Sequence, residues 1–559
     1  MPVSPTGHLV LVLHTHLPWV LGHGKWPHGQ DWLHEAIAEC YVPLLRTLDR
    51  LVADGISPKI TIGVTPVLAE MLTAKPLRDD FIAYCDGRIA IAESDRSEFH
   101  AHGAYEAAQL AGDWAVFYAG ILHEFLQTYK GDIIAALRRL QAAGHIEVLT
   151  SAATHGYLPL IGRDEMIAGQ IRAGVATYRR HFRRDPKGIW LPECAYRPAG
   201  LWTRPGGKSK SRRRPGLEEF LAANGLEYFF VDTHLVAGGT PSGTYEDRFA
   251  QKPAAKARKA TGLSPNELHA IATRSRKRVA VFARDPRSST QVWSADYGYP
   301  GDGVYLEFHK RKGDGGLRYH RITDRKIALD GKESYHPEPA ATRAQNHADH
   351  FVGIVRDTLA RFHAEHGRPG VVVAPFDTEL FGHWWFEGPR WLEAVIRGLQ
   401  GDAAPVTASD ALKKSPPESV IKLPEGSWGL GGQHYVWLNA DTKWVWEHVY
   451  RAEDEFLAIA KAAQRKRRDE VKRVVSQLAR ELLLLESSDW PFLITTASAR
   501  DYAEARVRLH AEAFDRLLAM ANRAMDGPLA PEDRAWLVEV EARDGPFPEV
   551  DLKWWTAES

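Results

Sequence analysis

Two short segments hold carboxylates in surroundings that favour sugar chemistry. Glu193 lies in the segment WLPECAY, directly after an apolar run that limits its hydration. Asp377 opens the stretch DTELFGHWW, in which further carboxylates stand among aromatic side chains. Burial and neighbouring charges tune the pKa of such groups, so that one can attack a sugar while the other donates a proton. A separation of about 5–5.5 Å between the two carboxyl groups would favour a covalent intermediate and retention of configuration.

A pair of histidines supports a different chemistry. His14 and His16 form a His-X-His motif at the end of the first apolar run, an arrangement that metal-dependent hydrolases use to hold an ion. Further ligands would have to come from other run ends, where the candidates are His155, Asp232, His234, Asp285 and Asp377. Alternatively, the histidines hydrogen-bond sugar hydroxyls and position a carboxylate. Residue types alone leave both interpretations open.

Seven apolar runs precede these polar residues and predict the strands that position them. The runs are Leu9–Leu13, Lys59–Val64, His145–Leu149, Gly188–Pro192, Tyr228–Val231, Val279–Ala283 and Gly370–Pro375. Such runs are typical of parallel strands buried on both faces, and the segments between them have helical character. A doubly wound sheet would concentrate the chemistry at one switch point, whereas a barrel uses the carboxyl ends of many strands. We therefore predict an α/β fold with a distorted, seven-stranded barrel.

The composition excludes several classes of protein. The chain has 559 residues with 71 basic and 71 acidic side chains, so no overall field would attract nucleic acid or anionic lipid. Its three cysteines, Cys40, Cys85 and Cys194, support no disulfide framework and suit a reducing compartment. No stretch approaches the roughly 20 apolar residues of a membrane span. We expect a cytoplasmic protein with no nucleic-acid or membrane partner, present as a monomer or small homo-oligomer.

The chain divides into four predicted segments. Residues 1–236 and 279–415 are expected to form the two parts of the catalytic barrel. Residues 237–278 are long and polar, and predict a small inserted domain or lid in which Ser264 caps a helix over Pro265–Thr273. Residues 416–559 show helical periodicity with charged faces, which predicts a helical C-terminal domain.

Motifs spread over nearly the whole chain carry a resemblance to a known family. They are VLHTHLP at 12–18, GKWPHGQDWLHEAI at 24–37, HIEVLTSAATHGYLPL at 145–160, WLPECAYRP at 190–198, FARDPRSSTQVWS at 282–294, GYPGD at 298–302, the Asp377 segment, WGLGGQHYVWLN at 428–439 and SSDWPFLI at 487–494. In these motifs the chain resembles glycoside hydrolase family 57, and within it the 1,4-α-glucan branching enzymes. One departure is Phe376-Asp377-Thr378-Glu379, where family members usually carry Tyr-Asp-Ala-Glu.

The resemblance implies a fold and a set of site residues. The fold is a (β/α)7 barrel with a helical insertion and an all-helical C-terminal domain that contributes to the glucan groove. The resemblance makes Glu193 the nucleophile and Asp377 the acid/base, with no metal and no cofactor. The residues implied to bind substrate are His14, His16 and His155 around the reacting sugar, Trp32, Trp293, Trp428 and Trp437 along the groove, and Arg284 and Asp489. Tyr245, in segment 237–278, is the candidate for a lid residue that shields the intermediate from water.

The implied activity acts on α-1,4 glucans such as amylose. A segment would be cleaved and transferred to a 6-hydroxyl by a retaining double displacement. Water as the acceptor would give an α-amylase, and a 4-hydroxyl would give a 4-α-glucanotransferase, so both remain alternatives within the family. A glucan-binding protein without catalysis is an alternative from another class, and the presence of both carboxylates argues against it.

Overall fold

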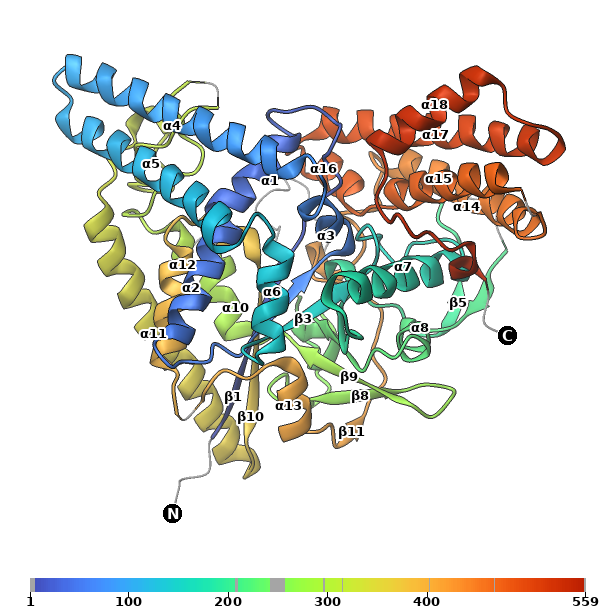
Figure 1. Ribbon diagram of the computed structural model, residues 1–559. Helices are drawn as coiled ribbons and strands as arrows, with labels where there is room; N and C mark the ends of the chain where they lie inside the picture. Colours follow the sequence, from blue (N-terminus) through green and yellow to red (C-terminus); the bar gives the residue numbers. More distant parts are fainter. Residues whose placement is uncertain are drawn as a thin grey trace.

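The fold is built around one curled sheet with helices on its outside (Figure 1). The computed structural model describes residues 6–206, 210–241, 257–294, 297–313, 315–401, 403–466 and 468–556. A separate group of helices from the C-terminal part of the chain packs against the upper right of the barrel in Figure 1.

Each of the seven predicted runs forms a strand of this sheet. The strands are β1 (Gly7–Thr15), β2 (Ile60–Val64), β3 (Ile146–Ser151), β4 (Gly188–Trp190), β7 (Tyr228–Val231), β9 (Arg278–Ala283) and β10 (Gly370–Asp377). Their order is β10-β1-β2-β3-β4-β7-β9, and every neighbouring pair in it is parallel. All nine residues of β1 are buried, as expected for a strand covered on both faces.

Strands β9 and β10 close the barrel without continuous strand pairing. The backbone N–H of Asp285, just after β9, donates to the carbonyl of Val373 in β10 at 2.8 Å. The outer side of β9 instead pairs with antiparallel β8 (His269–Ala272), which pairs in turn with β11 (Ser419–Val420). The barrel is therefore distorted, as predicted. The predicted helix over Pro265–Thr273 is wrong, because β8 lies there and pairs with the free edge of β9.

Helices connect and cover the strands. Those of the barrel region are α1 (Gln30–Ala36), α2 (Val42–Ala53), α3 (Pro66–Leu72), α6 (Ile133–Ala142), α7 (Asp164–Phe182), α8 (Leu217–Ala223), α9 (Thr233–Val236), α10 (Pro286–Trp293), α11 (Pro337–His366), α12 (Gly388–Gly398) and α13 (Ala408–Lys414). Two long helices, α4 (Leu77–Ala101) and α5 (Tyr105–His123), are inserted between β2 and β3 and project to the upper left in Figure 1. The main helical insertion of the described chain is thus this hairpin. Strands β5 (Gly200–Trp202) and β6 (Arg212–Arg214) form a small antiparallel ribbon.

The C-terminal part is helical from Lys443 onward, whereas the start of the predicted segment 416–559 holds strand β11 (Ser419–Val420). It contains α14 (Lys443–Ala463), α15 (Asp469–Leu485), α16 (Asp489–Thr496), α17 (Arg500–Asp526) and α18 (Pro531–Arg543). The short turn between α15 and α16 contacts the barrel, because Ser487 bridges to Gly156 and the Ser488 N–H donates to the His155 carbonyl at 3.2 Å. This turn brings C-terminal residues to the strand ends of the barrel.

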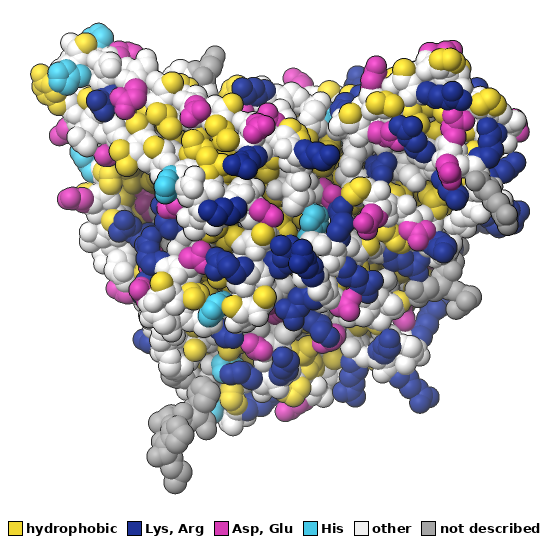
Figure 2. All heavy atoms as spheres, viewed as in Figure 1, with side chains coloured by type: hydrophobic (Ala, Val, Ile, Leu, Met, Phe, Trp, Pro, Cys, Tyr) yellow, Lys and Arg dark blue, Asp and Glu magenta, His cyan; other side chains and the backbone are white. Residues whose placement is uncertain are grey.

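Charges of both signs cover the face of the molecule that Figure 2 shows. In Figure 2, basic and acidic side chains are interspersed over most of the visible face, and basic side chains gather near its centre over α6 and α7. This mixture agrees with the equal numbers of acidic and basic residues in the sequence. Among the described residues, no helix combines the length and the apolar character that crossing a membrane requires.

Candidate active site

Parallel pairing brings the polar strand ends to one edge of the barrel. In the register between β1 and β10, His14 lies opposite Asp377. His155 follows β3, and Glu193 follows the neighbouring strand β4. Residues that are far apart in the sequence therefore meet at the carboxyl ends of the strands, which is where barrels carry their active sites.

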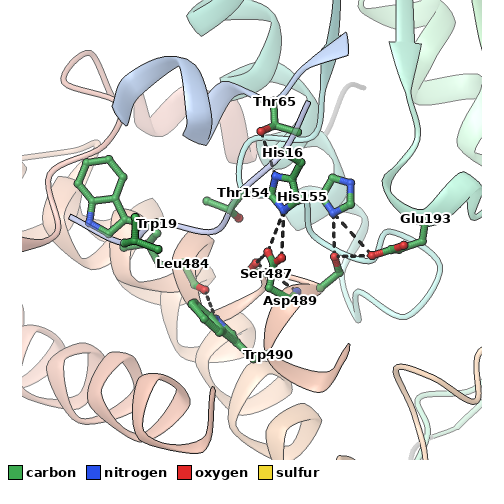
Figure 3. A network of polar contacts seen from close by, with 12 residues as sticks. His16, Trp19, Thr65, Thr154, His155, Glu193, Leu484, Ser487, Asp489 and Trp490 are labelled. Carbon is green, nitrogen blue, oxygen red and sulfur yellow. Dashed lines mark hydrogen bonds and ion pairs between the residues drawn. The ribbon is translucent and has the colours of Figure 1, made fainter. Parts of the chain in front are cut away.

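The backbone holds two of these side chains in an uncommon conformation. Glu193 has a φ angle of 62° and His155 one of 58°, and Cys194 beside the glutamate has 48°. A residue with a Cβ atom disfavours this left-handed region, so surrounding structure must impose it, and such residues gather at functional sites. In Figure 3 the Glu193 and His155 side chains point toward the same turn between α15 and α16.

The Glu193 carboxylate accepts a hydrogen bond at each oxygen. The indole N–H of Trp428 donates to Oε2 at 2.8 Å, and the Ser488 hydroxyl donates to Oε1 at 3.2 Å. Burial raises the pKa of Glu193 to about 7, while the Trp428 hydrogen bond lowers it and the charge of Asp377 raises it further. The two donors favour the ionised form of Glu193, because a carboxylate gains more from a donor than a neutral carboxyl group does.

Asp377 has different surroundings. Among the described residues its carboxyl group has no hydrogen-bond or ion-pair partner. Burial raises the pKa of Asp377 to about 7, and the charge of Glu379 adds to this rise. Glu379 itself is buried and accepts hydrogen bonds from the Tyr41 hydroxyl at 2.7 Å and the His16 N–H at 3.2 Å. The surroundings of Asp377 therefore favour its protonated form.

The three predicted histidines stack beside the carboxylates. The rings of His16 and His155 lie 4.0 Å apart, and Nε2 of His14 lies 3.0 Å from Nε2 of His155. Burial is the main cause that lowers the pKa of His14 and of His155 well below the ordinary value, and mutual repulsion within the cluster adds to it. Both imidazoles are therefore neutral and carry one N–H each.

His16 is held from two sides. Its Nε2 atom lies 3.0 Å from a carboxylate oxygen of Asp489 in α16, and its Nδ1 atom lies 3.0 Å from the Thr65 hydroxyl (Figure 3). Burial raises the pKa of Asp489, but its contacts with His16 and Ser487 bring it below the ordinary value. Asp489 is thus an anion that orients His16, and it reaches the site from the C-terminal helices.

The residues of the alternative metal site are engaged elsewhere. Asp232 forms an ion pair with Arg284 at 2.9 Å and also contacts His234 at 3.2 Å. Asp285 caps α10 by accepting from the Ser288 N–H at 2.8 Å. The described residues whose ligand atoms cluster closely enough to share an ion are His23, His510 and Asp544, which are not among the predicted ligands. Arg284, predicted to bind substrate, is buried in its pair with Asp232.

The predicted tryptophans occupy different positions. Trp293 and Trp428 are ring neighbours at 6.4 Å, and Trp293 is partly exposed. Trp437 is 0% exposed and stacks on Tyr157 at 4.3 Å, so no face of its ring is free for a sugar. Trp32 is partly buried, and its ring contacts His28 at 6.2 Å. Tyr245, the predicted lid residue, lies outside the described residues.

Comparison with known proteins identifies the family. The model of glycosyl hydrolase family 57 matches residues 10–424. The chain belongs to this family. A second model, described as the C-terminal part of 1,4-alpha-glucan branching enzyme, matches residues 448–555. A 1,4-alpha-glucan branching enzyme from Thermococcus kodakarensis is 45% identical over 544 residues, which cover 97% of this family 57 chain and 77% of that relative.

Three solved structures share the whole fold. The crystal structure of a branching enzyme from Thermococcus kodakaraensis, in complex with glucose and additives, gives a TM-score of 0.89 at 43% identity, covering 99% of this chain and 97% of that one. The branching enzyme from Pyrococcus horikoshii gives 0.88 at 39% identity with the same coverage. The alpha-amylase AmyC from Thermotoga maritima gives 0.80 at 30% identity and covers 99% of both chains. The predicted barrel with its helical C-terminal region is confirmed.

Sequence reasoning missed two contributors to this family 57 site. Ser488 contacts Glu193, and its neighbour Asp489 drew attention only through the motif SSDWPFLI. Glu379 was visible as a carboxylate two residues after Asp377, but its contacts with Tyr41 and His16 depend on packing between distant segments. Position within a motif was the available signal for both residues, and it did not indicate what each side chain contacts.

Proposed function

We propose that this family 57 chain is a 1,4-α-glucan branching enzyme that works by a retaining double displacement, with Glu193 as the nucleophile and Asp377 as the acid/base. Two branching enzymes match at 43% and 39% identity over 99% of the chain, and the model of the branching-enzyme C-terminal part also matches. The proposed substrates are α-1,4 glucans such as amylose and glycogen-like polymers.

One observation carries the assignment of roles. Glu193 and Asp377 are two carboxyl groups whose pKa values are both raised to about 7, mainly by burial. Glu193 accepts hydrogen bonds from Trp428 and Ser488, whereas Asp377 accepts none from the described residues. When the pair shares one proton, that proton is favoured on Asp377. An anion and an acid on facing strand ends are what the first step of a retaining mechanism requires.

The proposed reaction follows from this proton distribution. Glu193 attacks the anomeric carbon of a bound glucan while Asp377 protonates the departing glycosidic oxygen, which gives a covalent glycosyl ester. Asp377, now ionised, removes the proton from the 6-hydroxyl of an acceptor glucan. That oxygen displaces Glu193 from the anomeric carbon and leaves an α-1,6 branch. His14, His16 and His155 line the same strand ends, where we propose that they contact the reacting sugar.

The barrel and the C-terminal region contribute different parts of the proposed site. We propose that residues 1–236 and 279–415 supply the two carboxyl groups and the histidines. Residues 416–559 then supply Trp428, Ser488 and Asp489, which contact Glu193 or His16. The partly exposed Trp293 and Trp32 are proposed as stacking surfaces for the glucan. We assign the fully buried Trp437 to the wall behind Trp428 and Tyr157.

A digest of amylose by the purified protein tests this function. New α-1,6 linkages and new reducing ends are counted in the same digest, with Glu193→Gln and Asp377→Asn as inactive controls. A branching enzyme produces more α-1,6 linkages than reducing ends, and both products disappear in the two variants, by about 10³-fold or more. Reducing ends without α-1,6 linkages would refute branching. Near-wild-type turnover by Glu193→Gln would refute the nucleophile assignment.

An α-amylase is the second candidate. It is favoured by the match to the AmyC alpha-amylase, which covers 99% of both chains at 30% identity. The same digest separates the two functions, because an amylase releases one reducing end per bond cleaved. Segment 237–278 is proposed as the lid that keeps water from the intermediate, with Tyr245 as its candidate residue.

A further inference from the structure

Ser488 lies at a junction between the C-terminal helices and the proposed nucleophile. It immediately precedes α16, and its side chain is 1% exposed. Its hydroxyl lies 3.2 Å from Oε1 of Glu193 and 2.8 Å from Nδ1 of His155. Its backbone N–H donates to the His155 carbonyl at 3.2 Å. Ser488 is thus fixed by two contacts to His155 and one to Glu193.

The donors and acceptors along this path have one consistent arrangement. Ionised Glu193 offers only acceptors, so the single proton of the Ser488 hydroxyl must point to Oε1. The Ser488 oxygen is then left as the acceptor for His155, and Nδ1 of His155 must carry the N–H. Because neutral His155 has one N–H, its Nε2 is an acceptor and takes the proton of His14 Nε2, 3.0 Å away. These hydrogen bonds form a chain in which each residue donates to the next, from His14 through His155 and Ser488 to Glu193.

The surroundings of His14, the first donor of this hydrogen-bond chain, fit the same direction. If Nε2 of neutral His14 carries its N–H, then Nδ1 is left as a bare acceptor. Nδ1 of His14 is buried and has no hydrogen-bond partner among the described residues. It lies on the side of the ring that faces Gly63 of β2. The His14 ring is held in this orientation by stacking on Trp190, with ring centres 4.7 Å apart.

We propose that Ser488 is a positioning residue for Glu193: its hydroxyl ends a one-way hydrogen-bond chain from His14 and His155 and holds the nucleophile ionised and oriented. This inference rests on the proposed function of Glu193. The other titratable groups that face Glu193 are Asp377 of β10, Asp489 of α16, His16 just after β1, His155 after β3, and Tyr157 and Cys194. None of these provides a donor to Oε1 in place of the Ser488 hydroxyl.

The rate of covalent labelling tests the role of Ser488. An α-glucosyl fluoride with a second fluorine at C5 forms a slowly hydrolysed glycosyl ester, and intact mass with peptide mapping reports the rate and place of labelling. The labelling rate should fall at low pH as Glu193 becomes protonated, and this fall is the acid limb of the rate. Ser488→Ala should move the acid limb upward by about one pH unit, because the pKa of Glu193 rises when one hydrogen bond to the carboxylate is lost. One pH unit below the wild-type limb, labelling should be about 10-fold slower. Ser488→Thr keeps a hydroxyl and should restore the limb.

Ser151→Ala is a matched control. Ser151 is also 1% exposed, and its hydroxyl donates to the Trp190 carbonyl at 2.8 Å rather than to a carboxylate. It should lower stability by a similar amount and leave the acid limb in place. An unmoved limb in Ser488→Ala, or an equal shift in Ser151→Ala, would overturn the inference. Label on a residue other than Glu193 would instead overturn the nucleophile assignment and the inference with it.

Neutron diffraction from crystals of the wild-type protein gives a test that needs no variant. The expected deuterons lie on Nδ1 of His155 and on Nε2 of His14, with the Ser488 deuteron directed at Glu193. A deuteron on Nε2 of His155 would reverse the chain and overturn the inference, even if Glu193 proves to be the nucleophile.

Discussion

Replacing Trp428 by phenylalanine removes one donor from Glu193 and keeps the aromatic ring. The lost contact is the 2.8 Å hydrogen bond from the indole N–H to Oε2, between two buried side chains. A hydrogen bond to a charged group contributes about 1.5–3 kcal/mol, which corresponds to a rise of about 1–2 units in the pKa of Glu193. The pKa of Glu193 already lies at about 7. Because the proposed nucleophile must be ionised to attack, the fall in activity toward low pH (the acid limb) should move to higher pH.

The assay is the pH dependence of kcat/KM on a short maltooligosaccharide with an activated leaving group. Such a substrate reports the first chemical step and is insensitive to contacts with a long glucan. At pH 6, well below the pKa of Glu193, the ionised fraction and therefore kcat/KM should fall about 10- to 100-fold in Trp428→Phe. Above the shifted limb the variant should recover most of its activity.

Trp437→Phe is the matched control for this substitution. Trp437 is equally buried, but its indole N–H has no hydrogen-bond partner among the described residues. The phenyl ring retains the stacking against Tyr157, so the acid limb should remain at its wild-type pH. An unmoved limb in Trp428→Phe would refute the argument that indole donation keeps Glu193 ionised. An equal shift in both variants would show that loss of indole volume, not of the donor, is the cause.

Further predictions concern Glu379, Glu193 and the candidate lid residue Tyr245. Glu379→Gln removes a charge that raises the pKa of Asp377, so the alkaline limb of kcat/KM should move to lower pH; an unmoved limb would contradict this. Glu193→Gln should raise the free energy of unfolding, measured by denaturant titration, by up to about 3 kcal/mol at pH 8 and by little at pH 4.5. The reason is that a carboxyl group whose pKa is raised from 4.5 to about 7 in the folded state destabilises that state as the pH rises from 4.5 to 7. A gain independent of pH would indicate a packing effect. Tyr245→Ala should lower branching while hydrolysis of amylose persists or rises; a parallel loss of both would assign Tyr245 to binding or folding.

The strand framework could be read from the sequence, because each buried parallel strand leaves an uninterrupted apolar run. The runs before His14, Glu193 and Asp377 all became strands, and the residues that follow them meet at one edge. The helix expected over Pro265–Thr273 failed for a tertiary reason. The open edge of β9 pairs with β8 there, and this pairing outweighed the local capping signal of Ser264.

The tryptophans show where residue type stops being informative. Both Trp428 and Trp437 stand in the motif WGLGGQHYVWLN, and either could present a flat face to a sugar. In the structure Trp428 donates to Glu193, while Trp437 is enclosed against Tyr157. The difference depends on how residues after the barrel fold back over β4, and it leaves no trace in the spacing of the motif.

Two hydrogen-bond donors from outside the barrel, Trp428 and Ser488, distinguish Glu193 from Asp377. Strand ends bring Glu193 and Asp377 into one buried region, where burial raises both pKa values and the charge of Glu379 raises that of Asp377 further. Among the described residues, however, no barrel residue donates a hydrogen bond to either carboxyl group. Trp428 and Ser488 provide the distinction, and both follow the last barrel strand in the sequence. In the proposed mechanism, the turn before α16 therefore acts on the reaction through the ionisation of Glu193. Since Asp489 of the same region orients His16, the C-terminal part belongs to the proposed catalytic site as much as the barrel does.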